Sequence, residues 1–216
     1  MGRLRGLIVD WGGVLTTSLA QTMAAWCEAD GLVLAEFRQL MRDWVASSAD
    51  QAGAANPVHA LERGEIETAV FERELAGRLR SVDGRPIPAL GLLDRIFAGF
   101  GPDQEMVDAV RRAKATGIAT GLLSNSWGNT YPREGWDEMF DTIVISGEVN
   151  LRKPDPEIFQ LTADRLGLAP PECVFVDDLP VNVAGAEAVG MAGVHHESAA
   201  GTISALEGLF GVDLRS

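Results

Sequence analysis

The apolar residues of this chain occur in two patterns, short continuous runs and longer segments with helical spacing. The first run, Leu7 to Val9, ends at Asp10 and is followed by Gly12 and Gly13, which predicts a buried parallel strand with a carboxylate at its carboxyl end. Further runs predict buried strands at residues 118–123, 142–145, 173–176 and 192–195. Segments with helical spacing alternate with them, at residues 103–116, 135–140, 156–166, 180–189 and 202–210.

This alternation of strands and helices implies a parallel sheet that is covered by helices on both faces. Between the first two strands the pattern is different, because residues 18–30 and 34–80 show only helical spacing. Helices inserted directly after the first strand would lie over its carboxyl end as a cap. We therefore predict an α/β fold, a Rossmann-like parallel sheet with a helical cap inserted after the first strand. The core would comprise residues 1–16 and 88–216, and the cap residues 17–87.

Composition narrows the possible functions. The formal net charge of −13 opposes binding to nucleic acid or to an anionic membrane surface as the main role. Cys27 and Cys173 lie far apart in apolar surroundings, so neither a disulfide framework nor a zinc site is expected. No basic and apolar leader opens the chain, and no apolar run approaches the roughly 18 residues that span a bilayer. We expect a soluble cytoplasmic protein, monomeric or homodimeric, that acts on a small molecule.

Polar residues follow several of the predicted strands. Asp10 comes after the first strand, Ser124 and Asn125 after the second, and Asp177 and Asp178 after the fourth. Because the carboxyl ends of parallel strands meet at one edge of a sheet, these residues should converge on one crevice. Carboxylates that gather there repel each other, and either protonation of one of them or a bound hard cation such as Mg²⁺ would relieve the repulsion.

A lysine can complete this site. Lys153 lies in a loop just before a predicted helix, and the two prolines that follow it, Pro154 and Pro156, restrict the backbone. One cation that faces several carboxylates could hold both an anionic substrate and a nucleophile. Each residue taken alone also has a purely structural interpretation, as a helix cap or a turn residue. Their joint occurrence at the ends of successive buried strands favours a common site.

Four segments, in this order, resemble the motifs of the haloacid dehalogenase-like superfamily of aspartate-nucleophile hydrolases. They are Val9-Asp10-Trp11-Gly12-Gly13-Val14-Leu15, Leu123-Ser124-Asn125-Ser126-Trp127, Arg152-Lys153-Pro154-Asp155-Pro156-Glu157-Ile158-Phe159 and Val174-Phe175-Val176-Asp177-Asp178-Leu179-Pro180-Val181-Asn182. Within the superfamily the chain is most similar to the N-terminal phosphatase domain of soluble epoxide hydrolases. No Gly-x-Ser-x-Gly elbow occurs, so the resemblance does not include an epoxide-opening α/β-hydrolase domain.

The resemblance implies a phosphoryl transfer from a small phosphorylated molecule. Asp10 would attack phosphorus to form an aspartyl-phosphate, which water would then cleave. Ser124 and Asn125 would hold phosphoryl oxygens. Lys153 would orient Asp10 and neutralise charge.

The resemblance also implies a Mg²⁺ site and exposes a departure from the family pattern. Mg²⁺ would be bound by Asp10, by the backbone carbonyl of Gly12 and by Asp178, with Asp177 in support or acting through water. Family phosphatases usually carry a second aspartate two residues after the nucleophile, where this chain has Gly12. That aspartate protonates the leaving group and activates water, a contribution of about 10²–10⁴ in rate.

Three functions remain open. The first is a phosphatase that is slow, acts on phosphates whose leaving groups need no proton, or takes its acid from Thr16, Thr17 or the cap. The second is a non-catalytic protein that kept the fold. The third is a dehalogenase-like hydrolase, since that branch also lacks the second aspartate and carries a similar Leu-Ser-Asn motif. The pair Asp177 and Asp178 opposes the third, because halide displacement needs no metal. We rank the phosphatase first.

Overall fold

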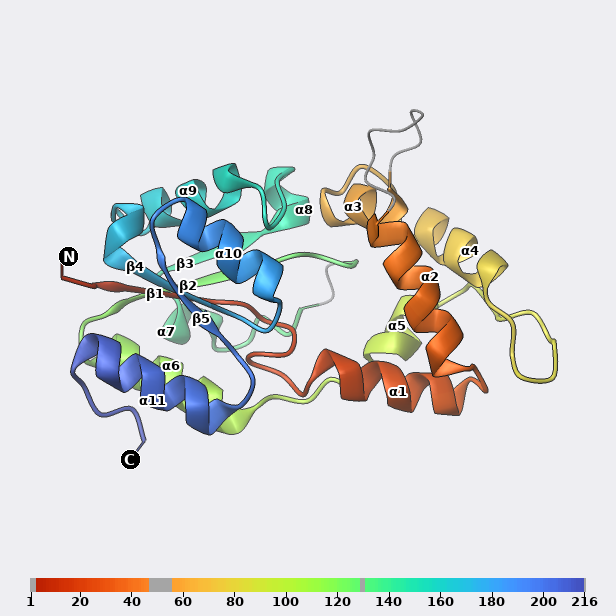
Figure 1. The fold of residues 1–216 in the computed structure, drawn as a ribbon, viewed down its shortest axis with the longest axis horizontal. Helices are drawn as coiled ribbons and strands as arrows, with labels where there is room; N and C mark the ends of the chain where they lie inside the picture. The colour runs from red at the N-terminus through yellow and green to blue at the C-terminus, as the bar shows by residue number, and fades with distance from the viewer. Residues whose placement is uncertain (1–2, 47–55, 129–130, 216) are drawn as a thin grey trace.

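A five-stranded parallel sheet forms the centre of the larger of two units in the computed structural model, which describes residues 3–46, 56–128 and 131–215 (Figure 1). The strands are β1 (Gly6–Val9), β2 (Ala119–Ser124), β3 (Thr142–Ile145), β4 (Cys173–Asp177) and β5 (Ala192–His195), in the order β3-β2-β1-β4-β5. All neighbouring strands pair in parallel, which confirms the predicted fold class. The central position of β1 puts Asp10 in the middle of the sheet edge, between the ends of β2 and β4.

Helices cover both faces of this sheet, as predicted. One face carries α6 (Gln104–Ala115), α7 (Trp136–Met139) and α11 (Ala199–Phe210), and the other carries α9 (Pro156–Arg165) and α10 (Pro180–Ala188) (Figure 1). The short 3-10 helix η1 (Pro170–Glu172) precedes β4. Within β1, Leu7 and Val9 pack into the first layer and Ile8 into the second. Strand side chains alternate between faces, so a strand that is buried on both faces requires the continuous apolar run seen in the sequence.

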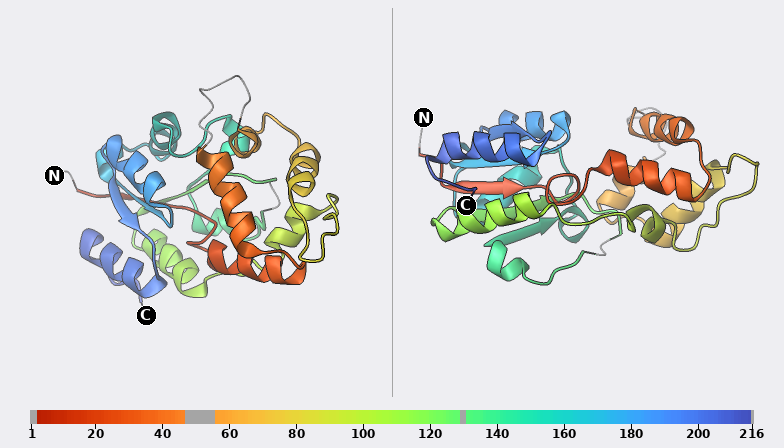
Figure 2. Two further views of the ribbon diagram at one scale, coloured as in Figure 1. Left: turned by 45° about the vertical axis from the view of Figure 1, so that its right-hand side comes forward. Right: turned by 90° about the horizontal axis from the view of Figure 1, so that it is seen from below.

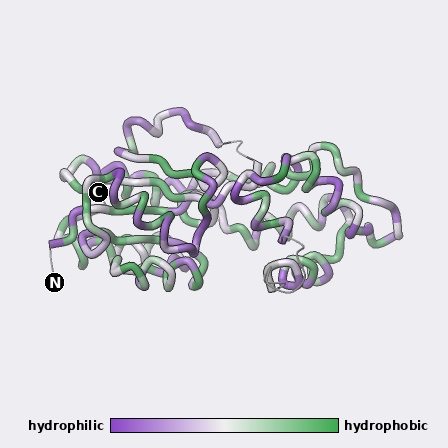
Figure 3. Tube along the Cα trace, turned by 90° about the horizontal axis from the view of Figure 1, so that it is seen from above, coloured by the Kyte–Doolittle hydropathy of each residue, from purple (hydrophilic) through white to green (hydrophobic). Residues whose placement is uncertain are grey.

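The second unit has helices and no named strand among its described residues, and it lies beyond the carboxyl ends of the strands (Figures 1 and 2). It contains α1 (Leu19–Ala29), α2 (Leu34–Ala46), α3 (Pro57–Glu62) and α4 (Thr68–Arg78), which share an apolar cluster with α5 (Leu92–Phe97). Hydrophobic and hydrophilic segments alternate along the chain in both units (Figure 3). None of the helices in the described part of the chain has the length and apolar character needed to cross a membrane.

Two chain segments that run side by side join the units. The amide of Thr17 donates to the carbonyl of Gly101 at 2.8 Å, and the amide of Asp103 donates to the carbonyl of Leu15 at 2.9 Å. The apolar side chains of α5 pack in the helical unit, so a division drawn from packing alone would fall after Phe97. The division into a core of residues 1–16 and 88–216 and a cap of residues 17–87 remains a proposal about which segments act together.

Candidate active site at the carboxyl ends of the strands

Asp10 follows β1 directly, and the backbone fixes its carboxylate. Its amide donates to the carbonyl of Val176 at 2.9 Å, which continues the pairing of β1 with β4 by one residue. The carboxylate oxygen Oδ1 accepts from the amide of Trp11 at 2.7 Å. Only 8% of the residue is exposed, so the carboxylate is largely shielded from solvent.

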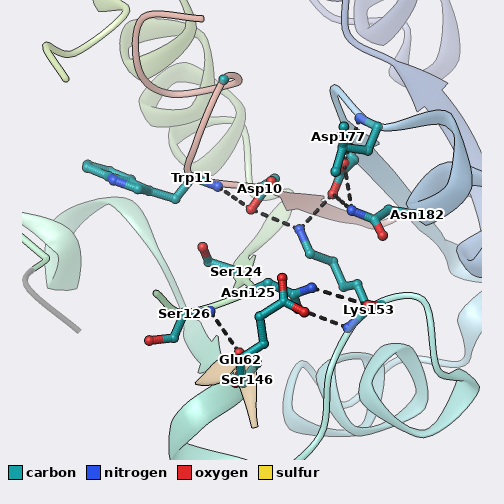
Figure 4. A network of polar contacts seen from close by, with 12 residues as sticks. Asp10, Trp11, Glu62, Ser124, Asn125, Ser126, Ser146, Lys153, Asp177 and Asn182 are labelled. Atoms are coloured by element: carbon teal, nitrogen blue, oxygen red, sulfur yellow. Dashed lines mark hydrogen bonds and ion pairs between the residues drawn. The ribbon is translucent and has the colours of Figure 1, made fainter. Parts of the chain in front are cut away.

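Lys153 provides the cation that the buried carboxylates need (Figure 4). Its Nζ lies 2.9 Å from Oδ1 of Asp10 and 2.6 Å from Oδ2 of Asp177, and the residue is only 1% exposed. Burial by itself lowers the pKa of a lysine, but the two carboxylates outweigh that effect and hold the pKa of Lys153 above its usual value. The lysine is therefore charged and ties the end of β1 to the end of β4.

The environment of Asp177 directs its carboxylate toward Lys153. The side chain is fully buried and accepts from Nδ2 of Asn182 at 3.0 and 3.1 Å and from the amide of Leu179 at 2.9 Å. Sequence reasoning gave Asn182 no role, although it closes the fourth motif segment, five residues after Asp177. That spacing on the first turn of α10 is the signal that could have identified it. With these donors in place, Asp177 is suited to orient Lys153.

Asp178 completes a cluster of carboxylates. One oxygen from each of Asp10, Asp177 and Asp178 lies within 4.8 Å of the others. Burial, followed by the charge of Asp177, raises the pKa of Asp178 to about 6. Burial likewise raises the pKa of Asp10 to about 7, with Lys153 opposing the shift and both other carboxylates adding to it. One lysine does not balance this cluster, and the oxygen donors suit a hard divalent cation.

The strand β2 brings a hydroxyl and an amide to the same edge. Ser124 is its last residue, and its Oγ lies 3.0 Å from the hydroxyl of Tyr131. The side chain of Asn125 joins two loops, because its Nδ2 donates to the carbonyl of Lys153 at 3.2 Å and its Oδ1 accepts from the amide of Lys153 at 2.9 Å. Tyr131 was missed by sequence reasoning and carried no recognisable signal there. Burial raises its pKa to about 12, so its phenol is neutral.

Gly12 and Gly13 serve different purposes in the loop after Asp10. Gly13 has a φ of +79°, and a Cβ there would lie 2.4 Å from Oδ2 of Asp178, so only glycine fits. Gly12 is not among the positive-φ glycines, and a Cβ built on it meets Phe100 Cζ at 4.0 Å, an ordinary contact. Neither conformation nor packing explains the absence of a side chain at Gly12.

Thr16 and Thr17, the two threonines considered as sources of the missing general acid, already form hydrogen bonds through their hydroxyls. Oγ1 of Thr16 accepts from the amide of Gly13 at 3.0 Å and donates to the carbonyl of Thr17 at 3.1 Å. Oγ1 of Thr17 donates to the carbonyl of Gly99 at 3.2 Å. Both hydroxyls hold the loop and the junction between the units, and the structure gives no support to either as the missing acid.

These elements bring carboxylates, an ammonium, a hydroxyl and an amide close together. The structure brings together, at one edge of the sheet, the sequence-predicted residues Asp10, Ser124, Asn125, Lys153, Asp177 and Asp178, with Gly12 in the adjoining loop. The arrangement can hold a divalent cation between carboxylates and an anion near the lysine, and it presents a carboxylate that can act as a nucleophile.

Comparison with known proteins agrees with this chemistry. The family model for haloacid dehalogenase-like hydrolases matches residues 4–190. The chain is 31% identical over 156 residues to the sesquiterpene phosphatase astK of Aspergillus oryzae, which covers 69% of this chain and 77% of that protein. It is 25% identical over 226 residues to bifunctional epoxide hydrolase 2 of Sus scrofa, covering 98% of this chain and 40% of that protein. This second match agrees with the resemblance to epoxide hydrolases inferred from the motifs.

A third relative shows how much longer some of these proteins are. Acyl-CoA dehydrogenase family member 10 of Mus musculus is 27% identical over 217 residues, which is 97% of this chain but only 19% of that protein.

Among solved structures, the HAD family enzyme BT-2542 of Bacteroides thetaiotaomicron, in complex with magnesium and inorganic phosphate, has the same fold with a TM-score of 0.61. The match is 19% identical and covers 90% of this chain and 94% of that one. The chain belongs to the haloacid dehalogenase-like hydrolases.

Proposed function

We propose that this protein is a Mg²⁺-dependent phosphatase that transfers the phosphoryl group of a small phosphorylated molecule to Asp10 and then to water. The observation that carries this proposal is the cluster of Asp10, Asp177 and Asp178 around the buried ammonium of Lys153. A phosphatase among the relatives, astK, and the magnesium and phosphate bound by an enzyme of the same fold support it.

The residues present fit a Mg²⁺ ion. Asp10, Asp178 and the backbone carbonyl of Gly12 would hold it, and Asp177 would act in support because its oxygens already accept from Asn182, Leu179 and Lys153. Burial, together with the neighbouring carboxylates, raises the pKa values of Asp10 and Asp178, and a bound divalent cation would favour their charged forms. When bound, Mg²⁺ would polarise the phosphoryl group and lower its charge repulsion with the carboxylates.

The contacts of Asp10 support different tasks for its two oxygens. Oδ1 accepts from Trp11 and Lys153, which leaves Oδ2 to attack phosphorus. The new bond joins Oδ2 to phosphorus while the bond from phosphorus to the leaving oxygen breaks, and that oxygen takes the electron pair. Water then attacks the aspartyl-phosphate, which returns the Asp10 carboxylate and releases inorganic phosphate. Lys153, Ser124 and Asn125 would stabilise charge on the equatorial oxygens.

Gly12 restricts the substrates that such a site processes well. Without an acid beside the leaving oxygen, the departing group must carry negative charge by itself. We therefore propose that activated phosphates, such as aryl and acyl phosphates, react faster than alkyl phosphate esters.

The test is release of inorganic phosphate from para-nitrophenyl phosphate and acetyl phosphate, with Mg²⁺ and after its removal by a chelator. Asp10→Asn should abolish release, whereas Asp164→Asn, at an exposed position on α9, should leave it unchanged. Failure of the wild-type protein to release phosphate from a broad panel with Mg²⁺ present would rule out the proposal.

The same Gly12 favours one competing function, a non-catalytic protein that binds phosphorylated molecules. Such a degenerate site should not bind fluoroberyllate, a mimic of the aspartyl-phosphate, at Asp10. Tight Mg²⁺-dependent binding of fluoroberyllate that Asp10→Asn removes would support the phosphatase instead. A dehalogenase would release halide from α-haloacids without metal, and the carboxylate cluster gives it no support.

A further inference from the structure

We propose that Glu62, at the end of α3 in the helical unit, is a positioning residue that holds together the two loops carrying Asn125 and Lys153. The consequence for turnover rests on the phosphatase function proposed above. That Glu62 holds the two loops together is a structural claim, and it can be tested without measuring turnover.

Glu62 contacts three separate segments of the core through its side chain and backbone. Its Oε2 accepts from Nε of Arg152 at 2.7 Å, and its Oε1 accepts from Nε1 of Trp127 at 3.2 Å. Its backbone carbonyl accepts from Oγ of Ser146, the first residue of α8 (Ser146–Val149). The residue is only 7% exposed, so these contacts are made away from solvent.

Two of these partners lie within two residues of the candidate active site in sequence. Arg152 immediately precedes Lys153, whose amide donates to Asn125 at 2.9 Å. Trp127 follows Ser126, whose amide donates to Oγ of Ser146 at 2.8 Å. Figure 4 shows Glu62 below Asn125, between Ser126 and Lys153 in this view. A continuous set of contacts therefore leads from the helical unit through both loops to the ammonium that holds Asp10.

Local structure explains how Glu62 reaches this place. Asn56 begins α3, with Pro57 as the first residue of the helix and with the Asn56 side chain accepting from the amides of Val58 and His59. After the helix, Gly64 has a φ of +70°, and a Cβ there would lie 2.9 Å from the carbonyl of Gly147 in α8. The two units thus meet at backbone distance beside Glu62, which fixes where its carboxylate lies.

The buried ion pair makes this contact sensitive to substitution. Removing one partner of a buried pair leaves the other charge without compensation, so Arg152 would have to move toward solvent. A displacement of about 1 Å of a catalytic group can lower turnover by about 10²-fold. Loss of the Glu62 charge should therefore disturb Lys153 and Asn125 although Glu62 itself touches neither the substrate nor the nucleophile.

Glu72 offers a matched control. It is a second glutamate of the helical unit with 7% exposure, and its Oε1 accepts from the amide of Leu93 at 3.0 Å. This contact joins α4 to α5 and does not involve the loops of the site. Glu62→Gln and Glu72→Gln remove the same charge from equally buried positions, so a general loss of stability should affect both variants.

The experiment compares the full-length wild type with Glu62→Gln, Glu72→Gln, Arg152→Gln and the double variant Glu62→Gln/Arg152→Gln. Amide exchange is followed at Ser126 and Lys153, the two amides that bond to side chains within the loops. Turnover of para-nitrophenyl phosphate and the inhibition constant of inorganic phosphate are measured with Mg²⁺. An inhibition constant is insensitive to the fraction of folded protein, so it separates positioning from stability.

We expect Glu62→Gln to accelerate exchange at both amides, to lower kcat by about 10²-fold and to raise the inhibition constant of phosphate, with Glu72→Gln close to wild type. The double variant should be no worse than the more affected single variant, because both changes act through one contact. Glu62→Asp, which keeps the charge, should recover part of kcat.

The proposal would be overturned if Glu62→Gln and Glu72→Gln showed the same amide exchange and the same inhibition constant for phosphate. It would also be overturned if the losses of the two single variants, Glu62→Gln and Arg152→Gln, added up in the double variant. If the wild type releases no phosphate, the proposed function fails. In that case the exchange data decide alone: unchanged amides in Glu62→Gln overturn the positioning role, and accelerated ones support it.

Discussion

Replacing Gly12 with aspartate would return to the site the carboxylate that family phosphatases usually carry two residues after the nucleophile. The structure allows the change. A Cβ at Gly12 meets Phe100 Cζ at 4.0 Å, and the backbone there is not in the left-handed region. Burial and, after it, the charge of neighbouring carboxylates raise the pKa of Asp10 to about 7 and that of Asp178 to about 6, and both effects would also raise the pKa of the new group. The new side chain would therefore hold the proton that a general acid must donate.

The size of the effect follows from the role of that proton. General acid catalysis contributes about 10²–10⁴ in rate, which corresponds to about 2.7–5.4 kcal/mol of transition-state free energy. The gain should be largest for leaving groups that are poor when unprotonated. Para-nitrophenolate leaves readily without a proton, so Gly12→Asp should change its release little while raising the turnover of alkyl phosphates by about 10²-fold or more.

The assay is a series of aryl and alkyl phosphates whose leaving groups span a wide range of pKa, measured as kcat/KM with Mg²⁺. Wild-type kcat/KM should fall steeply as the pKa of the leaving group rises, and Gly12→Asp should flatten this dependence. Gly12→Asn is the matched control, because it has the same shape and donates no proton. Gly13→Ala should lose activity, since its Cβ would lie 2.4 Å from Oδ2 of Asp178.

Two results would refute this reasoning. If Gly12→Asp and Gly12→Asn gave the same dependence on the leaving group, the side chain would not act as an acid. If wild type already processed alkyl and aryl phosphates equally well, another group would supply the proton and the restriction to activated phosphates would be wrong.

Three further predictions follow from other contacts. In a thermal unfolding experiment, Mg²⁺ at about a hundred times its dissociation constant should raise the Tm of the wild type by about 5–10 °C. Asp178→Asn should remove most of this shift. An equal shift in the variant would contradict the assignment of Asp178 as a metal ligand. Asn182→Ala leaves the buried Asp177 short of donors and should lower the free energy of unfolding by about 1–3 kcal/mol in denaturant titrations; a change below about 0.5 kcal/mol would show that the bonds from Asn182 are dispensable. Burial raises the pKa of the Cys27 and Cys173 thiols from 9.0 to about 11, which lowers the thiolate fraction at pH 8 by about 10²-fold. Both thiols should therefore react with a disulfide reagent only after the protein unfolds. Fast reaction of the folded protein would contradict this prediction.

The order of elements was accessible from the sequence, but their exact ends were not. Ser124 was expected just after the second strand and is its last residue, and Asp177 is likewise the last residue of β4. Both side chains are polar at the point where the apolar run stops, so the hydrophobic pattern ends one residue before the backbone pairing does. The helix α5 spans Leu92–Phe97, and its partners in the helical unit became visible only in the structure.

The local pattern of apolar and polar residues determined whether each segment of this protein forms a strand or a helix. Continuous apolar runs specified strands that are buried on both faces, helical spacing specified the layers around them, and the polar residues at the strand ends specified the edge that carries Asp10. Only the tertiary structure decided which residues hold that site in shape. Glu62 meets Trp127 and Arg152 across 65 and 90 residues of sequence, and no periodicity records such a pair. Contacts of this kind depend on how two separately packed units meet, which is a property of the assembled chain and not of any single segment.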